Sequence, residues 1–408
     1  MHAQSSSFPV AAPAPDSGLS DSLAFQHAPA AQRLFCGADS LGNLGRELDR
    51  LGCSRAVIIS GSSLHRDQLA SQRLRDALGH RLAGWIPGTV EHSPVPAVLE
   101  IARELERLQA DAVIAVGGGS AIVTARAASI LLAEGDDVHR LCSQKDAGGK
   151  WISPRLTQPK LPQLVVPTTP TTACVKAGSA VLDPVSGLRL ALFDPKTRAQ
   201  AVLIDPKLVA SVPASLVLSS SMNTLAMAVE GLESPQANPF SDALLMQSLR
   251  MLSEYLLPGM SGHTSGRCEL VVAAALCGQG TDFGGAGLAS VLGHAIGHKH
   301  GVANGLVNAI VLPHTMQFNA PATGHGAPHI AIALGAASQP RPDVKDAIDR
   351  VVSLLEKLPL PRRLRDVGIE QAALGAIAED ALSDWFLQRN PRRVTSSQEV
   401  LDLLHAAW

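Results

Sequence analysis

The sequence predicts an α/β domain followed by an all-α domain. Between Leu23 and Pro206, short apolar runs rich in β-branched residues alternate with segments whose apolar residues recur at helical intervals, which is typical of a parallel sheet covered by helices. From Lys207 onward, long Ala- and Leu-rich helical segments follow with few strand signals. A chain of 408 residues is long enough for two domains that share one cleft. We therefore expect a leader over residues 1–22, an α/β domain over 23–206 and an α-helical domain over 207–408.

Individual elements follow from this pattern. The apolar runs predict strands, and the amphipathic or Ala/Leu-rich segments predict helices. The predicted strands are Arg55–Ser60, Asp111–Val116, Leu164–Val166 and Ala201–Ile204. The predicted helices are Val95–Leu108, Ile122–Leu132, Pro213–Gly231, Pro239–Leu256, Cys268–Gly278 and Val344–Leu358.

Composition excludes several classes of protein. The formal net charge is −2 and no block of like charges occurs, which argues against a nucleic-acid or membrane partner and for a small molecule. The first residues are rich in Ser, Ala and Pro and have neither a basic nor a long apolar region, so we expect a flexible leader rather than a signal peptide. No apolar stretch reaches the roughly 18 residues of a membrane span. Six scattered cysteines without C-x-x-C pairs indicate reduced thiols, and we expect a cytoplasmic protein.

A glycine-rich turn is the first candidate site. The strand Asp111–Val116 runs into Gly117, Gly118, Gly119 and Ser120, and a helix follows. In this arrangement backbone N–H groups and the helix dipole can meet a phosphate, and glycines allow close approach. Taken alone, the run is equally compatible with an ordinary tight turn.

Several longer motifs occur in a fixed order. They are VGGGSAIVTARAASILL, LPQLVVPTTPTTACVKAGSAVLD, LIDPKLVASVPASLVLSSSMNTLAMAVEGLESPQANP and the closing NPRRVTSSQEVLDLL. From about Leu34 to the C-terminus the chain resembles the iron-containing alcohol dehydrogenases, and most closely their maleylacetate reductase branch. The resemblance implies a Rossmann-like domain, an all-α domain and a site for NAD or NADP between them.

The resemblance also assigns cofactor contacts. It places the glycine turn, Gly117 to Ser120, on the cofactor pyrophosphate, and Pro167, Thr168 and Thr169 near the nucleotide. The chain departs from the family at Val123 and Arg126, where an Asp and a Lys are usual, and at Thr172, Ala173 and Cys174, where Gly-Ser-Glu is usual. The bulkier loop predicts crowding of the nucleotide. Gly61-Ser62-Ser63 after the first strand contains no acidic residue to bind a ribose 2′-hydroxyl, so NADH and NADPH both remain open.

The metal ligands of the family are replaced. The resemblance implies an Asp and a His four residues apart on one helix, where the chain has Asn223 and Met227. Two further histidines correspond to Ser290 and Asn304 within GLASVLGHAIGHKHGVANG. These positions offer neither a carboxylate nor an imidazole to iron or zinc, so we expect no metal there.

Three histidines remain close to this segment. His294 and His298 are spaced to share one helical face, and His300 follows. Such a cluster could bind a metal, line a cleft or take part in catalysis. The resemblance places His294 beside the nicotinamide and the substrate oxygen, so it is the catalytic candidate; a structural histidine is the alternative. We assign His298 to the substrate pocket, together with Asn223, Met227, Ser290 and Asn304, and His314 to structure.

Two classes of function follow. The first is a metal-independent NAD(P)H-dependent reductase of a small oxo-acid or aldehyde, in which His294 donates the proton. Lys176, Lys299 and, less well placed, Arg126 are candidates for binding substrate carboxylates. The second is a non-redox enzyme, such as an isomerase, lyase or condensing enzyme, that uses the same fold, as dehydroquinate synthase does; a pseudoenzyme is a third reading. We also expect a homodimer, by analogy with the family. The substrate and the choice of NADH or NADPH stay open.

Overall fold

The computed structural model describes residues 25, 27–261, 266–336 and 342–408. The predicted leader, residues 1–22, lies outside them. The strands are β1 (Arg33–Cys36), β2 (Ala56–Ser60), β3 (Leu82–Pro87), β4 (Ala112–Gly117), β5 (Gln144–Lys145), β6 (Trp151–Ile152), β7 (Gln163–Pro167), β8 (Gly178–Leu182), β9 (Arg189–Phe193) and β10 (Ala201–Ile204).

The helices fall into two groups along the chain. Those that accompany the strands are α1 (Asn43–Leu51), α2 (Ser62–Arg66), α3 (Gln68–Leu78), α4 (Val95–Arg107), α5 (Gly119–Glu134) and α6 (Val138–Leu141). Those that follow the last strand are α7 (Pro206–Ala210), α8 (Ala214–Glu233), α9 (Pro239–Met260), α10 (Arg267–Gly284), α11 (Leu288–His300), α12 (Asn304–Asn319), α13 (Ala327–Ala333), α14 (Val344–Glu356), α15 (Leu374–Ala381) and α16 (Ser397–Ala407).

A six-stranded parallel sheet forms the first part of the molecule. Its strand order is β1-β10-β7-β4-β2-β3, and every neighbouring pair runs parallel. The chain passes from β2 outward to β3, then returns past β2 to β4 and continues in the opposite direction. The order therefore reverses between β2 and β4, and in open parallel sheets ligands bind outside the carboxyl ends of the strands at such a point.

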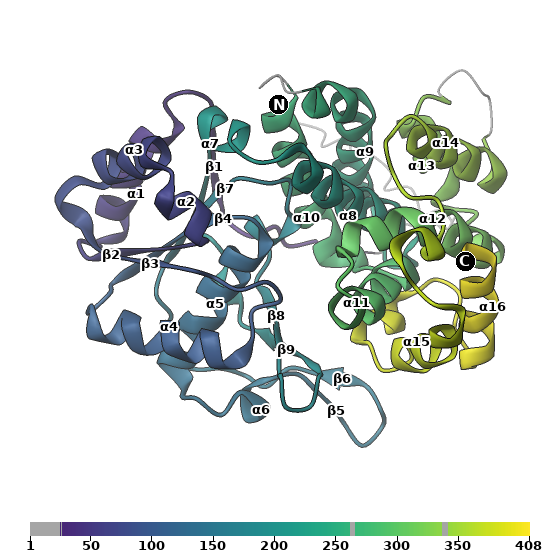
Figure 1. Cartoon of the computed structure of the whole chain (residues 1–408), viewed down its shortest axis with the longest axis horizontal. Coiled ribbons are helices and arrows are strands. Elements are labelled where there is room, and N and C mark those ends of the chain that lie inside the picture. The colour runs from purple at the N-terminus through teal and green to yellow at the C-terminus, as the bar shows by residue number, and fades with distance from the viewer. Residues whose placement is uncertain (1–24, 26, 262–265, 337–341) are drawn as a thin grey trace, which may run out of the picture.

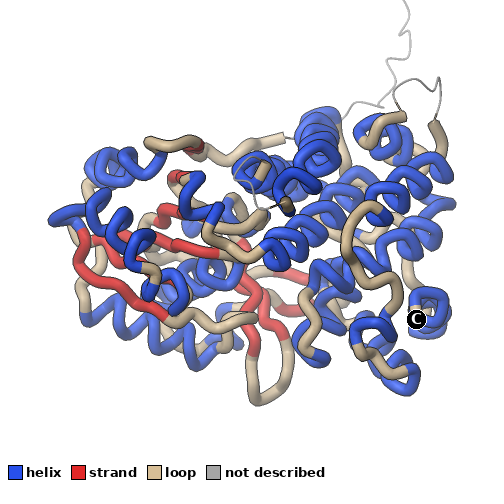
Figure 2. Tube along the Cα trace, turned by 45° about the horizontal axis from the view of Figure 1, so that its top comes forward, coloured by secondary structure: helices blue, strands red, loops and turns tan. Residues whose placement is uncertain are grey.

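Both faces of the sheet are buried, which explains the continuous apolar runs in the sequence. Alternate residues of β2 enter two different cores: Val57 and Ile59 pack against α4 and α5, whereas Ala56 and Ile58 pack against α1 and α3. Figure 2 shows the strands enclosed by helices. The sheet edge that carries the glycine turn is thus held by packing on both sides.

The second part is helical and has its own core. Residues of α8 to α16 form one apolar cluster around α8, whose residues from Val217 to Leu232 are largely buried. α9 begins at Pro239 behind Asn238, whose side chain caps the helix through the N–H groups of Phe240 and Ser241. Figure 1 shows this bundle beside the sheet, with the two antiparallel hairpins β5–β6 and β8–β9 below the sheet. Among the described residues, no helix is long and apolar enough to cross a bilayer.

The predicted fold class is confirmed, with differences in detail. Each predicted strand and helix is present within a few residues of its expected ends. The sequence pattern missed β1, β3 and the two hairpins. β1 and β3 lie at the two edges of the sheet and are only partly buried, so their apolar pattern is weak.

Candidate active site between the sheet and the helical part

The glycine turn lies at the carboxyl end of β4, where α5 begins. Gly117 has φ +143, a backbone conformation that favours glycine, and Gly118 is the N-cap of α5 without a side-chain hydrogen bond. All four residues from Gly117 to Ser120 are partly exposed. The first N–H groups of α5 are therefore free of a side-chain cap and accessible, as an anion site at a helix N-terminus requires.

The second nucleotide loop, which follows β7, covers this turn. Thr169 Oγ1 lies 3.1 Å from the place where a β-carbon on Gly118 would be, and Thr171 Oγ1 lies 3.3 Å from the equivalent place on Gly119. Thr168 donates its N–H to the carbonyl of Gly117 at 3.0 Å. Pro167, Thr168 and Thr169 thus lie beside the glycine turn, as the resemblance implied.

The bulky residues of this loop face the helical part instead. Thr172 Oγ1 lies 3.6 Å from Met227 Sδ on α8, and Cys174 is fully buried. The carbonyl oxygen of Thr172 lies 2.8 Å, and a methyl carbon of Val175 2.4 Å, from the place where a β-carbon on Gly278 of α10 would be. The side chains of Thr172 and Cys174 are therefore buried against α8 and α10, whereas Thr169 and Thr171 face the glycine turn.

A loop that the sequence analysis did not single out also meets the turn. His92 and Ser93, between β3 and α4, have positive φ values of 62 and 51 although neither is glycine. Ser93 Oγ accepts from Thr124 at 2.8 Å and lies 3.4 Å from the carbonyl of Ser120. Consecutive residues in this unfavourable region concentrate at functional sites, and no local sequence pattern identifies them.

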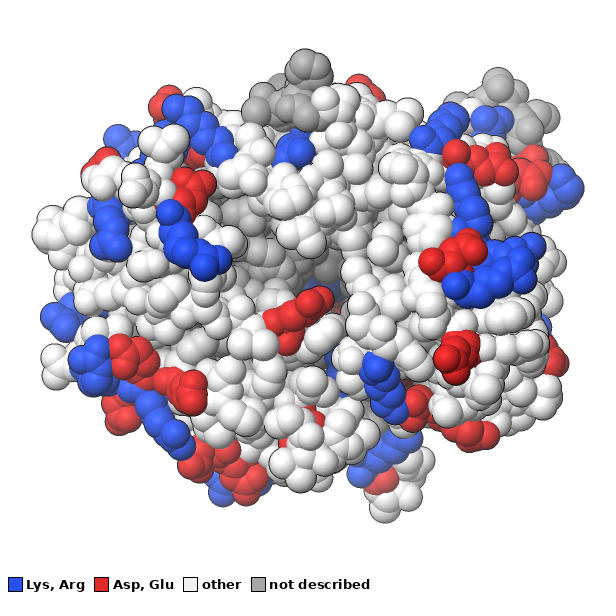
Figure 3. Space-filling view, in the orientation of Figure 1, with Lys and Arg blue, Asp and Glu red and all other residues white. Residues whose placement is uncertain are grey.

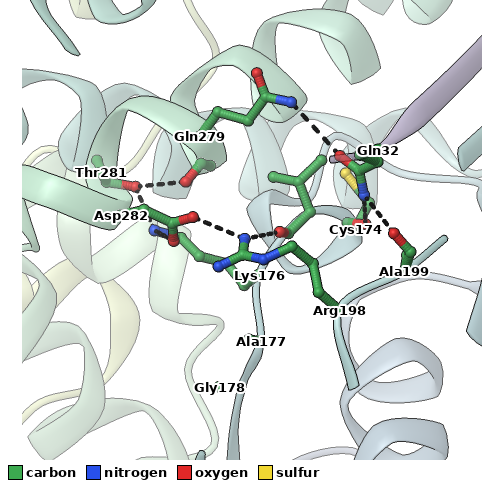
Figure 4. A network of polar contacts seen from close by, with 12 residues as sticks. Gln32, Cys174, Lys176, Ala177, Gly178, Arg198, Ala199, Gln279, Thr281 and Asp282 are labelled. Atoms are coloured by element: carbon green, nitrogen blue, oxygen red, sulfur yellow. Dashed lines mark hydrogen bonds and ion pairs between the residues drawn. The ribbon is translucent and has the colours of Figure 1, made fainter. Parts of the chain in front are cut away.

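Polar contacts hold the two parts together behind the second loop. Lys176 reaches Thr281 at 2.7 Å and Asp282 at 3.2 Å on α10. Arg198 pairs with the same Asp282 at 2.7 Å and also donates to the carbonyl of Val175. Figure 4 shows Lys176 and Arg198 converging on Asp282. This network fixes the loop against α10.

The basic residues proposed for substrate binding are all engaged elsewhere. Lys176 belongs to the network just described, and Lys299 pairs with Asp380. Arg126 is fully buried and donates to the carbonyls of Gly178 and Ala173 at 2.5 and 2.6 Å. Burial lowers the pKa of Arg126 to about 10. The structure therefore gives all three side chains structural contacts, and the one buried donor of Arg126 without a partner, Nε, belongs to a side chain that is fully buried.

The helical wall carries the positions where the family binds metal. Asn223 Nδ2 lies 3.5 Å from Met227 Sδ one turn further along α8. The amide of Asn223 also lies 3.1 Å from that of Asn308 on α12. Oriented to satisfy its amide, Asn308 donates to the carbonyls of Ala289 and Asn304 at 2.9 and 3.1 Å. Asn308, which the sequence analysis missed, therefore links these helices, and its place four residues after Asn304 is the signal that could have found it.

Ser290 is directed at a buried carboxylate. Its Oγ donates to Glu230 Oε2 at 2.5 Å and its N–H donates to Oε1 at 2.9 Å. Burial raises the pKa of Glu230, and the hydrogen bonds from Ser290 oppose this. Ser290 thus completes a polar network inside the helical part.

Asn304 begins α12 and packs against a glycine of α11. Its Oδ1 lies 1.9 Å from the place of a β-carbon on Gly297, and the side-chain amide of Asn308 lies 2.1 Å from that on Gly293. α11 and α12 approach this closely only because both positions lack a side chain. The Oδ1 of Asn304 is buried without a hydrogen-bond partner among the described residues.

His294 is oriented by an aspartate ninety residues away. Its Nδ1 lies 2.7 Å from Asp384 Oδ2, and Asp384 Oδ1 accepts the N–H of Phe386 at 2.8 Å. Although burial opposes ionisation of Asp384, its pKa is lowered by His294, so the group is a carboxylate. A carboxylate only accepts, so Nδ1 of His294 carries the proton. Nε2 makes no hydrogen bond to a described residue, and 14% of the side chain is exposed.

The pKa of His294 is lowered, which decides its charge. Burial is the main cause, and the positive charge of Arg189 adds to it. Asp384 raises the pKa but does not compensate fully. The imidazole is therefore mainly neutral at pH 7, with its lone pair on Nε2, and it takes a second proton at lower pH.

Aromatic residues and one arginine surround His294. The rings of Phe386 and Trp385 lie 5.3 and 6.3 Å from it. The guanidinium of Arg189, on β9, lies 5.8 Å from the Trp385 ring. His298 donates from Nδ1 to the carbonyl of His294 at 3.0 Å, and its ring lies 6.2 Å from that of His92. Asp384, Arg189 and His92 were all missed by the sequence analysis, because each meets His294 or His298 only through the fold.

Figure 3 shows the surface hollowed between the sheet and the helical part, with few charged side chains around the hollow. His314, which we assigned to structure, lies away from it on α12. It lines a separate cavity of about 450 Å³ with residues of α14, including Val352 and Leu355. Burial lowers the pKa of His314.

Comparison with known proteins identifies the family. The sequence profile described as iron-containing alcohol dehydrogenase matches residues 31–206, and the profile of the C-terminal region of the Fe-containing alcohol dehydrogenase family matches residues 217–408. The chain belongs to the iron-containing alcohol dehydrogenase family. It is thereby an oxidoreductase by family, and the resemblance found in the sequence is confirmed.

Curated relatives of this family align over nearly the whole chain. The probable alcohol dehydrogenase EutG of Escherichia coli is 28% identical over 91% of this chain and 92% of its own. The lactaldehyde reductase of Escherichia coli is 27% identical, over 91% and 97%. The maleylacetate reductase of Burkholderia cepacia is 26% identical, over 92% and 95%. The maleylacetate reductase branch is thus among the relatives, as the motifs indicated.

Solved structures show the same fold. An alcohol dehydrogenase from Oenococcus oeni superposes with a TM-score of 0.85 at 21% identity, over 93% of this chain and all of the other. Maleylacetate reductase from Agrobacterium tumefaciens superposes with a TM-score of 0.75 at 22% identity, over 95% and 98%.

The residues at the family's metal positions do not fit iron or zinc. Asn223 contacts Met227 and Asn308, Ser290 is bound to Glu230, and Asn304 is packed on Gly297. An amide, a thioether and a hydroxyl lack the negative charge and imidazole nitrogens that these dications need. Within residues 27–261, 266–336 and 342–408, no three His, Cys, Asp or Glu side chains gather in a metal-binding group.

Proposed function

We propose that this protein is an NAD(P)H-dependent reductase of a small oxo-acid or aldehyde that works without the metal of its family. The observation that carries the proposal is the His294–Asp384 pair, in which Nδ1 and Oδ2 lie 2.7 Å apart. The neighbouring His298 ring lies 6.2 Å from that of His92, next to Ser93, which contacts the glycine turn. A histidine held in one tautomer by a carboxylate is a proton-transfer group. The replaced ligand set supports the absence of iron or zinc from the mechanism.

The sheet wall fits a dinucleotide. The glycines from Gly117 to Gly119 leave room at the carboxyl end of β4, and the first turn of α5 has uncapped N–H groups for a pyrophosphate. Thr169 and Thr171 lie over this turn and would line the nucleotide site. Bound there, a reduced nicotinamide would supply a hydride to a carbonyl carbon.

The residues of the helical wall would handle the proton. In the imidazolium form, His294 would hydrogen-bond the carbonyl oxygen through Nε2–H and transfer that proton to it as the alcohol forms. Asp384 holds Nδ1–H throughout and so keeps Nε2 as the reacting nitrogen. The reverse reaction would use the neutral imidazole as the base. Because a metal Lewis acid is worth several kcal/mol of charge stabilisation, amides such as Asn223 would have to add hydrogen bonds to the oxygen.

Binding and turnover test the proposal separately. Purified protein is titrated with NADH and with NADPH, and cofactor fluorescence is followed. It is then mixed with the preferred cofactor and a panel of short oxo-acids and aldehydes, and loss of reduced nicotinamide is measured. Saturable binding with turnover supports a reductase. Saturable binding without turnover of any carbonyl compound would favour the non-redox alternative, and no binding of either nucleotide would reject the proposal.

A further inference from the structure

We propose that Arg189 and His298 form a subsite for an anionic group, a carboxylate on the substrate. This inference rests on the proposed reductase function and adds a substrate class to it. The residues predicted from the sequence to bind carboxylates are engaged in structural contacts. The cleft therefore needs another cation if its substrate is an acid, and Arg189 is placed to provide it.

The first argument is an unpaired guanidinium. Nη1 of Arg189 is buried and makes no hydrogen bond to any described residue. Arg189 forms no ion pair with Asp384, whose two oxygens accept from His294 and from the N–H of Phe386. Burial lowers the pKa of Arg189, and Asp384 opposes this. Burying an unpaired charged donor is costly, and an arriving carboxylate would relieve that cost.

The second argument is an unpaired histidine nitrogen in the same region. Nε2 of His298 is buried without a partner among the described residues, while its Nδ1 donates to the carbonyl of His294. Nε2 would therefore donate to an anion only in the imidazolium form, which a bound carboxylate favours. Burial is the main cause of the lowered pKa of His92, and both Arg189 and His298 lower it further. The same two side chains also lower the pKa of His294. The rings of His298 and His92 lie 6.2 Å apart, and the Trp385 ring lies 5.8 Å from the Arg189 guanidinium and 6.3 Å from the His294 ring, so both side chains border the same group of rings.

The position of Arg189 favours the substrate over the cofactor as the source of the anion. Arg189 stacks on Trp385, which lies beside His294, the proposed proton donor. The glycine turn already offers backbone N–H groups to phosphates. An anion held by Arg189 would lie next to the group that protonates the carbonyl oxygen. A guanidinium also matches the planar geometry of a carboxylate and can bind it through two hydrogen bonds.

The test compares two aldehydes of similar length, succinic semialdehyde and butanal, in the wild type and in Arg189→Met. We expect the substitution to lower kcat/KM for succinic semialdehyde roughly 10- to 100-fold, because it removes a charged hydrogen bond, and to change that for butanal less than about 3-fold. Arg155→Met, which alters an exposed arginine of the same part, is the control. Arg189→Lys retains the charge and checks folding. Equal losses for both aldehydes would overturn the subsite while leaving the reductase proposal intact.

A binding measurement separates the subsite from the reaction. Calorimetry with succinate alone, without nucleotide, should give saturable binding in the wild type and binding at least about 10-fold weaker in Arg189→Met and in His298→Ala. The same binding in the absence of any carbonyl reduction would support the subsite and reject the reductase. If Arg189→Met weakens NADH binding and leaves succinate binding unchanged, Arg189 serves the cofactor phosphate, and the proposal is wrong.

Discussion

The sheet side of the cleft and its helical side differ in what they present to a ligand. The sheet side presents backbone: the uncapped first turn of α5 and the glycines before it, with Gly117 at φ +143. The helical side presents side chains, and at Asn223, Met227, Ser290 and Asn304 these differ from those that bind metal in the family. A backbone site depends on conformation and small residues, whereas a side-chain site can change by substitution while the helices stay in place. This difference supports our proposal that the chain binds a nucleotide through its backbone and works without the family's metal.

Removing the His294 imidazole has the largest expected effect and tests the helical side of the cleft. We expect His294→Ala to lower kcat roughly 10²- to 10⁴-fold, the usual contribution of a general acid, with NADH binding retained. His300→Ala, an exposed residue of the same helix, should keep the wild-type rate. Steady-state kinetics with the best carbonyl substrate decide it. A His294→Ala enzyme with an unchanged rate would remove the histidine from the mechanism.

A side chain introduced into the glycine turn tests the sheet side of the cleft. Gly118 has a backbone conformation open to any residue, but its β-carbon would lie 3.1 Å from Thr169 Oγ1, where the nucleotide must approach. Gly118→Val should weaken NADH or NADPH binding by about 100-fold and leave the fold intact. Gly375→Val, at an exposed glycine with open space around it, is the control in fluorescence titrations. Unchanged affinity would show that the nucleotide does not use this turn.

The pH dependence of the reduction rate tests whether Asp384 acts through the pKa of His294. Because Asp384 raises the pKa of His294 against burial, Arg189 and His298, Asp384→Asn should lower that pKa further. The imidazolium then loses its proton at a lower pH than in the wild type. The reduction rate at pH 7 should therefore fall by about 10-fold, and the falling limb of the pH–rate profile should move to more acidic pH. Asp380→Asn, which alters the partner of Lys299, should leave the profile in place. A lower rate with an unmoved profile would indicate a purely structural role.

The smallest expected effect concerns Ser290. Ser290→Ala removes a hydrogen bond from the buried Glu230 and should lower the free energy of unfolding by about 1–3 kcal/mol, with less than about a 3-fold change in rate. Urea denaturation measures the free energy of unfolding, and Ser253→Ala, at an exposed position, is the control. A large loss of activity at unchanged stability would instead place Ser290 in the reaction.

The sequence predicted the fold well because the fold depends on local patterns. β2, β4, β7 and β10 are fully buried runs, and the glycine turn follows one of them directly. The resemblance singled out His294, whose role stays a proposal. The sequence could not find Asp384 or Arg189, because their contacts join segments 90 or more residues apart, and no local sequence spacing indicates such contacts. Its choice of Lys176, Lys299 and Arg126 rested on residue type, and only the fold shows that these side chains make structural contacts.

The most direct test of the metal-free mechanism is the metal content of the active enzyme. Protein purified without added metal is analysed for iron and zinc, and its carbonyl reduction is measured before and after prolonged treatment with a chelator. With Asn223, Met227, Ser290 and Asn304 in place of the ligands, we expect far less than one metal ion per chain and an unchanged rate. One iron or zinc per chain, with a rate that the chelator abolishes and the metal restores, would contradict the account.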